Sequence, residues 1–339
     1  MAVTIRDVAE AAGVSSMAVS KVLHGRGTNV RVSAETAEAI KRAASELRYQ
    51  PNVLARSLRS RRTHTLGLIF NNFGRLAGGS QYMVQLLDGM TSAAFQAGYS
   101  LTICPKLAAS DSVSLLNDGR FDGVVWGKVL QDDEMLEHLE HAPVPVVALH
   151  ISHPTSLGRT SFVCCDNDGG LELAVDHLYR LGHRRIAFVA DQENLDAQET
   201  RLRGDAFKKA MTRRNLSCSD TDVLCWHESG TDLVEYWRAG ARHTALILKS
   251  EEMAGNVLGM ARGLGIQVPE DLSIVGFDSS PYCEATTPRM TAIRQPIEQM
   301  ASKAVQLLVD CIEGRADKGQ HLVFPCGFDI RESTSRPRG

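Results

Sequence analysis

The chain has 339 residues, 43% of them hydrophobic, which is enough for two or three cores. Its formal net charge of −3 is unevenly spread, because residues 1–62 carry 11 Lys and Arg against five Asp and Glu, and the remainder carries 26 against 35. A basic segment joined to an acidic body indicates nucleic-acid binding by one domain. No apolar run approaches the roughly 20 residues that cross a bilayer, and no signal peptide precedes Thr4, so we expect a cytoplasmic protein without a membrane partner.

The cysteines and histidines show no metal-ligand pattern. Eight cysteines are present without a CxxC pair, and Cys164 and Cys165 lie inside an apolar run. We therefore expect reduced structural thiols, no metal and no cofactor.

The first predicted helix begins after Thr4. Thr4 and Asp7 fit a capping box, and the residues that then recur on one helix side are Ile5, Val8, Ala9 and Ala12. Gly13 ends this helix, and Ser15 is placed to cap a second one. The inward stripe of the second helix consists of Val19, Val22 and Leu23.

Two short helices joined by a glycine-containing turn indicate a helix-turn-helix unit. In such a unit the second helix lies in the major groove of DNA, with its first residues at base edges. This geometry puts Ser16, Met17 and Ser20 on the outer face, with Lys21 close behind.

A third helix is predicted from Ser33, with Ala37, Ile40, Ala44 and Leu47 facing inward. Pro51 stops it and opens a short fourth helix that reaches Leu58. Because an isolated helix of two turns is marginal in water, this segment can be ordered on DNA and disordered away from it. Four arginines between residues 56 and 62 then form a linker that contacts phosphate or serves as a solvated tether.

From Thr65 onward, short apolar runs alternate with helical stretches. The runs are typical of buried strands, for example TLGLIF, VPVVALH, RIAFVA, ALILKS and LSIVGF. The helices are predicted over residues 82–97, 170–181, 201–213, 252–262 and 296–313. This alternation predicts an α/β body of two doubly wound parallel-sheet subdomains, which bind ligands at the carboxyl ends of their strands.

The sequence resembles the LacI/GalR family of bacterial transcription regulators over nearly its whole length. The matching segments include DVAEAAGVS (7–15), VSAETAEAI (32–40), LRYQPNVLARSL (47–58), HLYRLGHRRIAFV (177–189) and LSIVGFD (272–278). The resemblance implies a homodimeric repressor that binds a near-palindromic operator in double-stranded DNA. It also implies a small-molecule effector, a sugar or sugar derivative, bound between two lobes similar to those of periplasmic sugar-binding proteins.

The resemblance also implies a domain plan. Residues 1–50 are expected to form the helix-turn-helix head, residues 51–64 the hinge helix and linker, and residues 65–339 the effector-binding and dimerisation body. Within the body, the first lobe is expected to hold residues 65–166 and 296–322, and the second lobe residues 167–295 and 323–339. The chain then crosses between lobes near Asp166, Gln295 and Val323.

In the head, the resemblance assigns base reading to Ser16, Met17 and Lys21. The remaining predicted DNA contacts, mostly to phosphate, are Thr4, Ser15, Ser20, Arg31, Ser33, Thr36 and Asn52. Leu58, with Ala55 beside it, matches the leucine that related repressors insert into the minor groove; the alternative is that Leu58 packs on the partner hinge or the body. Ser15 and Ser33 can instead serve only as helix caps.

In the body, Arg201 matches the family's effector-binding arginine, and Asp278 matches a carboxylate that binds sugar hydroxyls or a base edge. The alternative is that these two residues pair structurally. Weaker candidates are Ser250, Trp226, Tyr82, Asp166 and Gln295, and a core role is equally expected for Trp226 and Tyr82. Ser250 and Asp205 both depart from the family pattern, so the pocket is expected to be unusual.

Other classes of protein explain less of the chain. The motifs of nucleotide-binding enzymes, zinc proteases and serine hydrolases are absent from the sequence. A solute-binding protein leaves the basic head unexplained, and a nucleoid-type DNA binder leaves the body unexplained. An effector-responsive regulator explains both, although the effector and the sign of control stay open.

Overall fold

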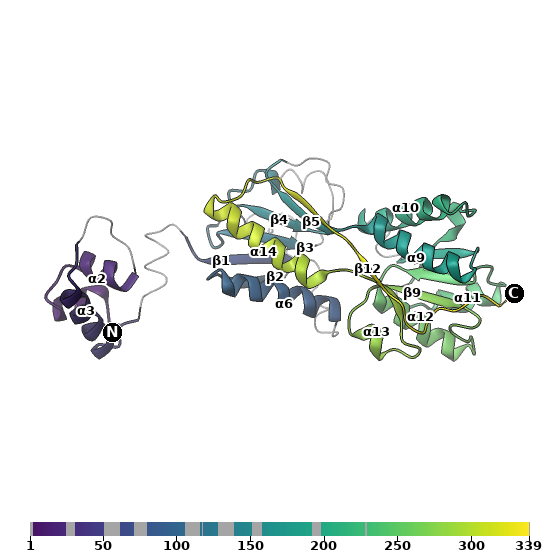
Figure 1. The fold of residues 1–339 in the computed structure, drawn as a ribbon, viewed down its shortest axis with the longest axis horizontal. Coiled ribbons are helices and arrows are strands. Elements are labelled where there is room, and N and C mark those ends of the chain that lie inside the picture. The colour runs from purple at the N-terminus through teal and green to yellow at the C-terminus, as the bar shows by residue number, and fades with distance from the viewer. Residues whose placement is uncertain are drawn as a thin grey trace. The chain divides into compact units, whose positions relative to one another are not determined.

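The computed structural model describes residues 3–24, 31–50, 62–70, 80–105, 116, 118–127, 139–150, 158–191, 198–227 and 229–338. The chain divides into two compact units, Met1–Thr63 and His64–Gly339 (Figure 1). We call the first unit the head and the second unit the body.

The described part of the head contains three helices, α1 (Ile5–Ala11), α2 (Ser16–His24) and α3 (Ala34–Glu46). The capping box of α1 is present, since the Thr4 hydroxyl accepts from the Asp7 N–H and the Thr4 N–H donates to the Asp7 carboxylate at 2.7 Å. Gly13 has a φ of +64° and lets its own N–H and that of Val14 bond back to the last turn of α1. These local signals are the ones that the sequence predicted for this helix.

Side chains from all three helices form one small core in the head. Its buried members are Val8, Ala9, Ala18, Val19, Ile40, Ala43 and Ala44. The predicted inward residues Ala12, Val22, Leu23 and Leu47 are only partly buried and pack around this core. Because Ala18 and Val19 of α2 face inward, the residues on either side of them face outward.

The first lobe of the body is built on a six-stranded sheet in the order β11-β5-β4-β3-β1-β2, and all of its pairs are parallel. Its strands are β1 (Thr65–Phe70), β2 (Ser100–Pro105), β3 (Gly123–Gly127), β4 (Val146–Leu149), β5 (Ser161–Cys165) and β11 (His321–Phe324). Helices α6 (Gln81–Gln96) and α14 (Ile297–Glu313) pack against each other. A Cβ at Gly89 of α6 would collide with the Glu298 carbonyl of α14, so glycine permits their close approach.

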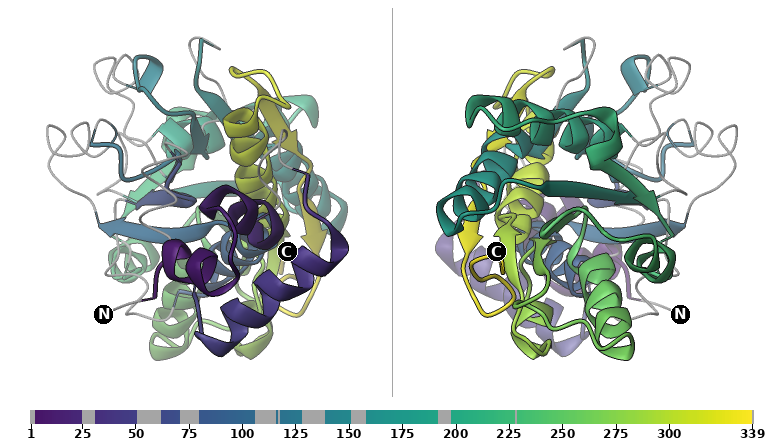
Figure 2. Two further views of the ribbon diagram at one scale, coloured as in Figure 1. Left: turned by 90° about the vertical axis from the view of Figure 1, so that its left-hand side faces the viewer. Right: turned by 90° about the vertical axis from the view of Figure 1, so that its right-hand side faces the viewer.

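The second lobe has a sheet in the order β12-β10-β9-β8-β6-β7, in which only the β10–β12 pair is antiparallel. Its strands are β6 (Ile186–Asp191), β7 (Val223–Trp226), β8 (Ala245–Leu248), β9 (Ser273–Asp278), β10 (Thr291–Arg294) and β12 (Gly327–Asp329). Its helices are α9 (Asn167–Leu181), α10 (Gln198–Arg213), α11 (Asp232–Arg238), α12 (Glu251–Gly263) and α13 (Tyr282–Ala285). Helices α9 and α10 pack side by side (Figures 1 and 2).

The chain passes between the two sheets three times, after β5, after β10 and after β11. The first two crossings lie beside Asp166 and Gln295. The third comes later than the predicted Val323, because Val323 still pairs with Cys164 in the first sheet. Pairing continues to Phe324, whose carbonyl accepts the Asp166 N–H at 2.8 Å. The first lobe therefore keeps residues 323 and 324, and the yellow segment that follows leads to β12 (Figure 1).

The observed architecture confirms the predicted fold class of a helix-turn-helix head followed by two doubly wound α/β lobes. The predicted hinge helix, from Pro51 to Leu58, lies outside the described residues. No helix in the described part of the chain combines the length and the apolar character needed to span a membrane.

Candidate functional site

The exposed face at the start of α2 is the first candidate site. The Ser15 hydroxyl accepts from the Ala18 N–H at 3.2 Å and so caps the helix. Met17, one residue into the helix, is 68% exposed although it is apolar. Ser16, Ser20 and Lys21 are half-buried. Met17 is therefore the most prominent apolar side chain that this face offers to a partner.

The start of α3 presents a second pair of hydroxyl groups. Ser33 Oγ accepts from the Thr36 N–H at 3.1 Å and lies 2.8 Å from Thr36 Oγ1. Arg31 is exposed two residues earlier. Helix N-termini favour anions, so a cation and two hydroxyls at this end can bind a phosphate group. The capping role that the sequence left open for Ser15 and Ser33 is present, and the exposed hydroxyls still have acceptor and donor capacity.

The second candidate site lies at the carboxyl ends of the second lobe's strands. Asp191 ends β6 and Lys249 directly follows β8, and Lys249 Nζ lies 2.6 Å from Asp191 Oδ2. Both residues are buried. A buried charge is stable only when it is paired, so these two side chains fix each other at the strand ends.

Arg203 of α10 connects four elements at this edge. Its Nε donates to Asn167 Oδ1 at 3.0 Å and its Nη1 donates to the Lys249 carbonyl at 2.6 Å. Its guanidinium lies 3.6 Å from the centre of the Phe277 ring. Asn167 in turn donates to Glu199 at 2.6 Å. The arginine at the centre of this network is thus Arg203, whereas the predicted Arg201 is exposed two residues earlier.

Asp278 stands on a strained turn at the end of β9. Asp278 and Ser279 have φ values of +103° and +54°, which side chains other than glycine rarely adopt. The turn is held on one side by Glu251, which accepts from the Ser280 N–H at 2.7 Å and from the Ser280 hydroxyl. On the other side, the Ser279 hydroxyl donates to Asp329 at 2.8 Å. Such strain persists only where the surroundings fix it, so these contacts hold the Asp278 carboxylate in a defined position.

Gln295 lies beside this carboxylate at the second crossing. Its side chain is 4% exposed, and its Nε2 donates to Asp278 Oδ1. Its Oε1 has no hydrogen-bond partner among the described residues. A buried, unsatisfied acceptor is costly, so this oxygen is a position for a ligand donor.

The first lobe faces the same carboxylate with Tyr82 of α6. Burial and the nearby Asp278 charge raise the pKa of Tyr82 well above its usual value, and the Tyr82 hydroxyl is hydrogen-bonded to His150. Burial and Asp278 also raise the pKa of Glu251 in the second lobe. Asp278 therefore acts electrostatically on groups of both lobes.

The other predicted site residues have structural roles. Asp166 caps α9 by accepting from the Gly169 N–H at 2.9 Å, and Ser250 caps α12 by accepting from the Met253 N–H at 3.2 Å. Trp226 is 5% exposed and belongs to an apolar cluster, with its ring 5.3 Å from that of Tyr236, so it takes the core role that the sequence left open. Asn52, Ala55 and Leu58 lie outside the described residues.

Sequence reasoning missed the supporting residues Asp191, Lys249 and Arg203. A signal was present for two of them, because Asp191 and Lys249 each follow an apolar strand run directly. Within the described ranges, no group of three or more His, Cys, Asp and Glu residues is placed to hold a metal ion.

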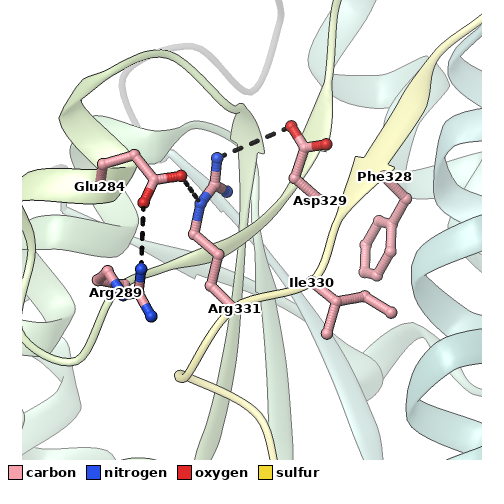
Figure 3. A pocket seen from close by; sticks show the side chains of 6 residues that line it. All are labelled: Glu284, Arg289, Phe328, Asp329, Ile330 and Arg331. Atoms are coloured by element: carbon pink, nitrogen blue, oxygen red, sulfur yellow. Dashed lines mark hydrogen bonds and ion pairs between the residues drawn. The ribbon is translucent and has the colours of Figure 1, made fainter.

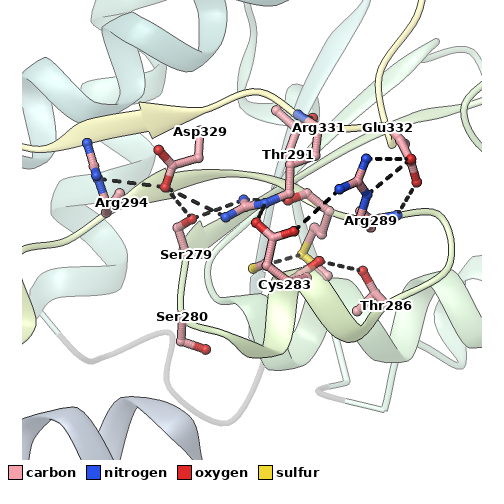
Figure 4. A network of polar contacts seen from close by, with 12 residues as sticks. Ser279, Ser280, Cys283, Thr286, Arg289, Thr291, Arg294, Asp329, Arg331 and Glu332 are labelled. Atoms are coloured by element: carbon pink, nitrogen blue, oxygen red, sulfur yellow. Dashed lines mark hydrogen bonds and ion pairs between the residues drawn. The ribbon is translucent and has the colours of Figure 1, made fainter.

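A pocket of about 570 Å³ opens on the second lobe near the same turn (Figure 3). It is lined by Glu284, Arg289, Phe328, Asp329, Ile330 and Arg331. Its charged groups are paired: Arg331 donates to Glu284 at 2.5 Å (Figure 3). Arg289 donates to Glu332, next to the lining residue Arg331, at 2.8 Å (Figure 4). Arg331 also donates to Ser279 at 3.1 Å, so this network supports the Asp278 turn.

Three family models match the chain. "Bacterial regulatory proteins, lacI family" matches residues 4–52, and "Periplasmic binding proteins and sugar binding domain of LacI family" matches residues 63–233. A periplasmic binding protein-like domain matches residues 175–334. The matches thus span both the head and the two lobes.

Known regulators resemble the chain over nearly its full length. It is 30% identical to the HTH-type transcriptional regulator CelR of Thermobifida fusca, over 97% of this chain and 98% of that protein. A CelR–cellobiose complex is 29% identical with a TM-score of 0.72, and covers 98% of this chain and 99% of its own. A lac repressor dimer bound to operator and an anti-inducer is 25% identical with a TM-score of 0.84, covering 99% and 100%.

Proposed function

Because the chain belongs to the lacI family of bacterial regulatory proteins, we propose that its head reads an operator and that a sugar or sugar derivative bound in its body controls that binding. It is a DNA-binding transcription regulator. We propose that it is a repressor and that it acts on the chromosome in the cytoplasm. The observation that carries the function is the likeness, over head and body together, to a repressor bound to its operator. Its relatives are regulators, and we propose no enzymatic activity for it.

The head is proposed to bind DNA through the N-termini of α2 and α3. Met17 and its neighbours Ser16, Ser20 and Lys21 are proposed to face the bases. Thr4, Ser15, Arg31, Ser33, Thr36 and Asn52 are proposed to contact phosphates. Ala55 and Leu58 are proposed to enter the minor groove.

The full-length protein can select its operator from a random duplex library, and we expect two inverted half-sites in the selected sequences. In gel-shift titrations, Met17→Ala is expected to weaken operator binding about tenfold, which corresponds to one lost base contact. Leu173→Ala, which removes an apolar side chain that is 42% exposed on α9 of the body, is the matched control. Equal affinity of the Met17 variant and the wild type would exclude Met17 from the interface.

In the body, Asp278 and the free acceptor of Gln295 are proposed to receive hydrogen bonds from ligand hydroxyls, with Arg203 fixing the strand ends around them. Arg201 is proposed to contact the ligand directly from the exposed side of α10. Tyr82, Asp166, Ser250 and Trp226 surround or support the site.

Thermal shift of the full-length protein tests this site, with cellobiose as the first probe and other disaccharides, monosaccharides and nucleosides as the panel. A sugar is expected to raise the melting temperature, and Asp278→Asn is expected to abolish the shift while leaving operator binding intact. Arg201→Ala and Arg203→Ala distinguish the two arginines. Loss of the shift only in the Arg203 variant would remove Arg201 from the site. A response to nucleosides alone would refute the sugar assignment.

The body is also proposed to form the homodimer. Phe95 of α6 is 84% exposed, and Val84 on the same helix and Ile103 on the edge strand β2 are also exposed. Exposed apolar residues on adjoining elements are typical of a subunit interface. Phe95→Ser is expected to shift sedimentation toward the monomer, whereas Leu173→Ser is expected to leave it unchanged.

A further inference from the structure

Two cysteine thiols meet where two of the three crossings run side by side. Cys165 is the last residue of β5, and Cys326 lies between β11 and β12. Parallel pairing sets Cys165 opposite Phe324, two residues before Cys326. The two segments are therefore held at the spacing of neighbouring strands, about 5 Å, at the point where the chain leaves the first lobe.

The two thiols are neighbours in one apolar cluster, in which Cys165 is buried and Cys326 packs against the buried residues. A hydrogen bond to the Cys326 thiol, together with burial, raises the pKa of the Cys165 thiol well above its usual value. The Cys326 sulfur is also confined by α9, because a Cβ added at Gly170 would lie only 3.3 Å from it. Both side chains therefore lie in the same cluster, and that of Cys326 lies against the first turn of α9.

The two thiols differ in access. Cys165 is buried, whereas Cys326 is half-buried beside the exposed Pro325. An oxidant from solvent therefore reaches Cys326 first, and Cys165 is placed behind it as the resolving thiol.

We propose that Cys165 and Cys326 are an oxidative modification site, which a low-molecular-weight disulfide such as oxidised glutathione converts into an intramolecular disulfide that clamps two of the three crossings. This inference rests on the thiols alone and is independent of the identity of the effector.

The chemistry balances in two exchange steps. The Cys326 thiolate attacks one sulfur of oxidised glutathione, forming a mixed disulfide and releasing one glutathione thiolate. Cys165 then loses its proton to solvent and attacks the Cys326 sulfur, which releases the second glutathione. Two electrons pass from the two cysteines to the oxidant, and two protein thiols become one disulfide while one oxidised glutathione becomes two reduced ones.

The bridge has a mechanical consequence. Any movement of one lobe against the other must be accommodated at the three crossings, and a covalent link between two of them restricts that movement. The link also closes a loop that contains nearly all of the second lobe, so it lowers the entropy of the unfolded chain.

The test uses full-length protein equilibrated in glutathione buffers of increasing oxidised fraction. Peptide mass spectrometry without reductant is expected to show a cross-link between the peptides of Cys165 and Cys326, reversed by dithiothreitol. Oxidation is expected to raise the melting temperature of the body by about 5 °C and to slow hydrogen exchange around residues 166–170 and 325–330.

Matched variants distinguish this pair from the other cysteines. Cys326→Ser is expected to abolish the cross-link and the thermal shift. Cys164→Ser, which changes the neighbouring buried cysteine on the other side of β5, is expected to keep both. Glutathione retained on Cys326 of the wild type without a cross-link would overturn the proposal. A cross-link that changes neither melting nor exchange would overturn the clamp.

Discussion

The head and the body differ in how far apart in sequence their interacting residues lie. In the head, the capping contacts join residues three positions apart, as in Thr4 with Asp7 and Ser33 with Thr36. In the body, Lys249 and Asp191 are 58 positions apart and Ser279 and Asp329 are 50 apart. The head therefore presents a surface fixed by short-range signals, whereas the body's site exists only after distant strand ends have met.

The largest expected effect comes from breaking a long-range contact in the body. Asp191→Asn leaves the buried Lys249 ammonium without its charge partner and should destabilise the body by about 3 to 5 kcal/mol. Tryptophan fluorescence in urea reports this selectively, because Trp126, Trp226 and Trp237 all lie in the body. Adding Lys249→Met should restore part of the loss, and purely additive losses in the double variant would show that the pair is not coupled.

The corresponding change in the head is Ile40→Ala. Ile40 is fully buried among the three helices, so its truncation should cost about 2 to 5 kcal/mol, a large part of what so small a core supplies. Loss of the head's amide resonance dispersion with unchanged tryptophan fluorescence is the expected result. Concerted loss of both signals would show that the two units unfold together.

A smaller effect is expected from the helix caps. Ser33→Ala removes the acceptor for the Thr36 N–H and should destabilise the head by about 1 kcal/mol. Ser45→Ala, an exposed substitution within α3, is the matched control and should be neutral. If both variants melt alike, the cap contributes nothing to the head.

The smallest expected difference is in pH dependence. Burial lowers the pKa of His177, His183 and His243 in the body below the usual 6.5. The unfolded body then binds more protons than the folded body, so stability is fully present above about pH 6.5 and falls as the pH drops below that value. His24 is the only histidine of the head. Lowering the pH from 7.5 to 5 should therefore reduce the free energy of unfolding of the body more than that of the head. Urea titrations at both pH values measure the two losses, and equal losses would contradict the role given to these histidines.

The sequence predicted what depends on local signals. The helices of the head, the stop at Gly13 and most strands of the body follow from caps and apolar periodicity. β7, β10 and β12 were not predicted, because each is only three or four residues long and is stabilised by its neighbours in the sheet. The sequence alone did not show whether Arg201 or Arg203 faces the strand ends. Residues two positions apart on a helix face nearly opposite sides, and only the packing of α10 against the strand ends decides which of the two is enclosed.

The three crossings also decide when the protein can be finished on the ribosome. The head is complete once α3 has emerged, early in synthesis. The first lobe still lacks α14 and β11 until residue 324 has been made, and the second lacks β12 until residue 329. Both lobes therefore stay nearly complete, but with open edges, until about the last eighth of the chain has been made. A nascent polypeptide halted before α14 exposes the surfaces that α14, β11 and β12 cover, and such surfaces are prone to aggregate unless chaperones shield them.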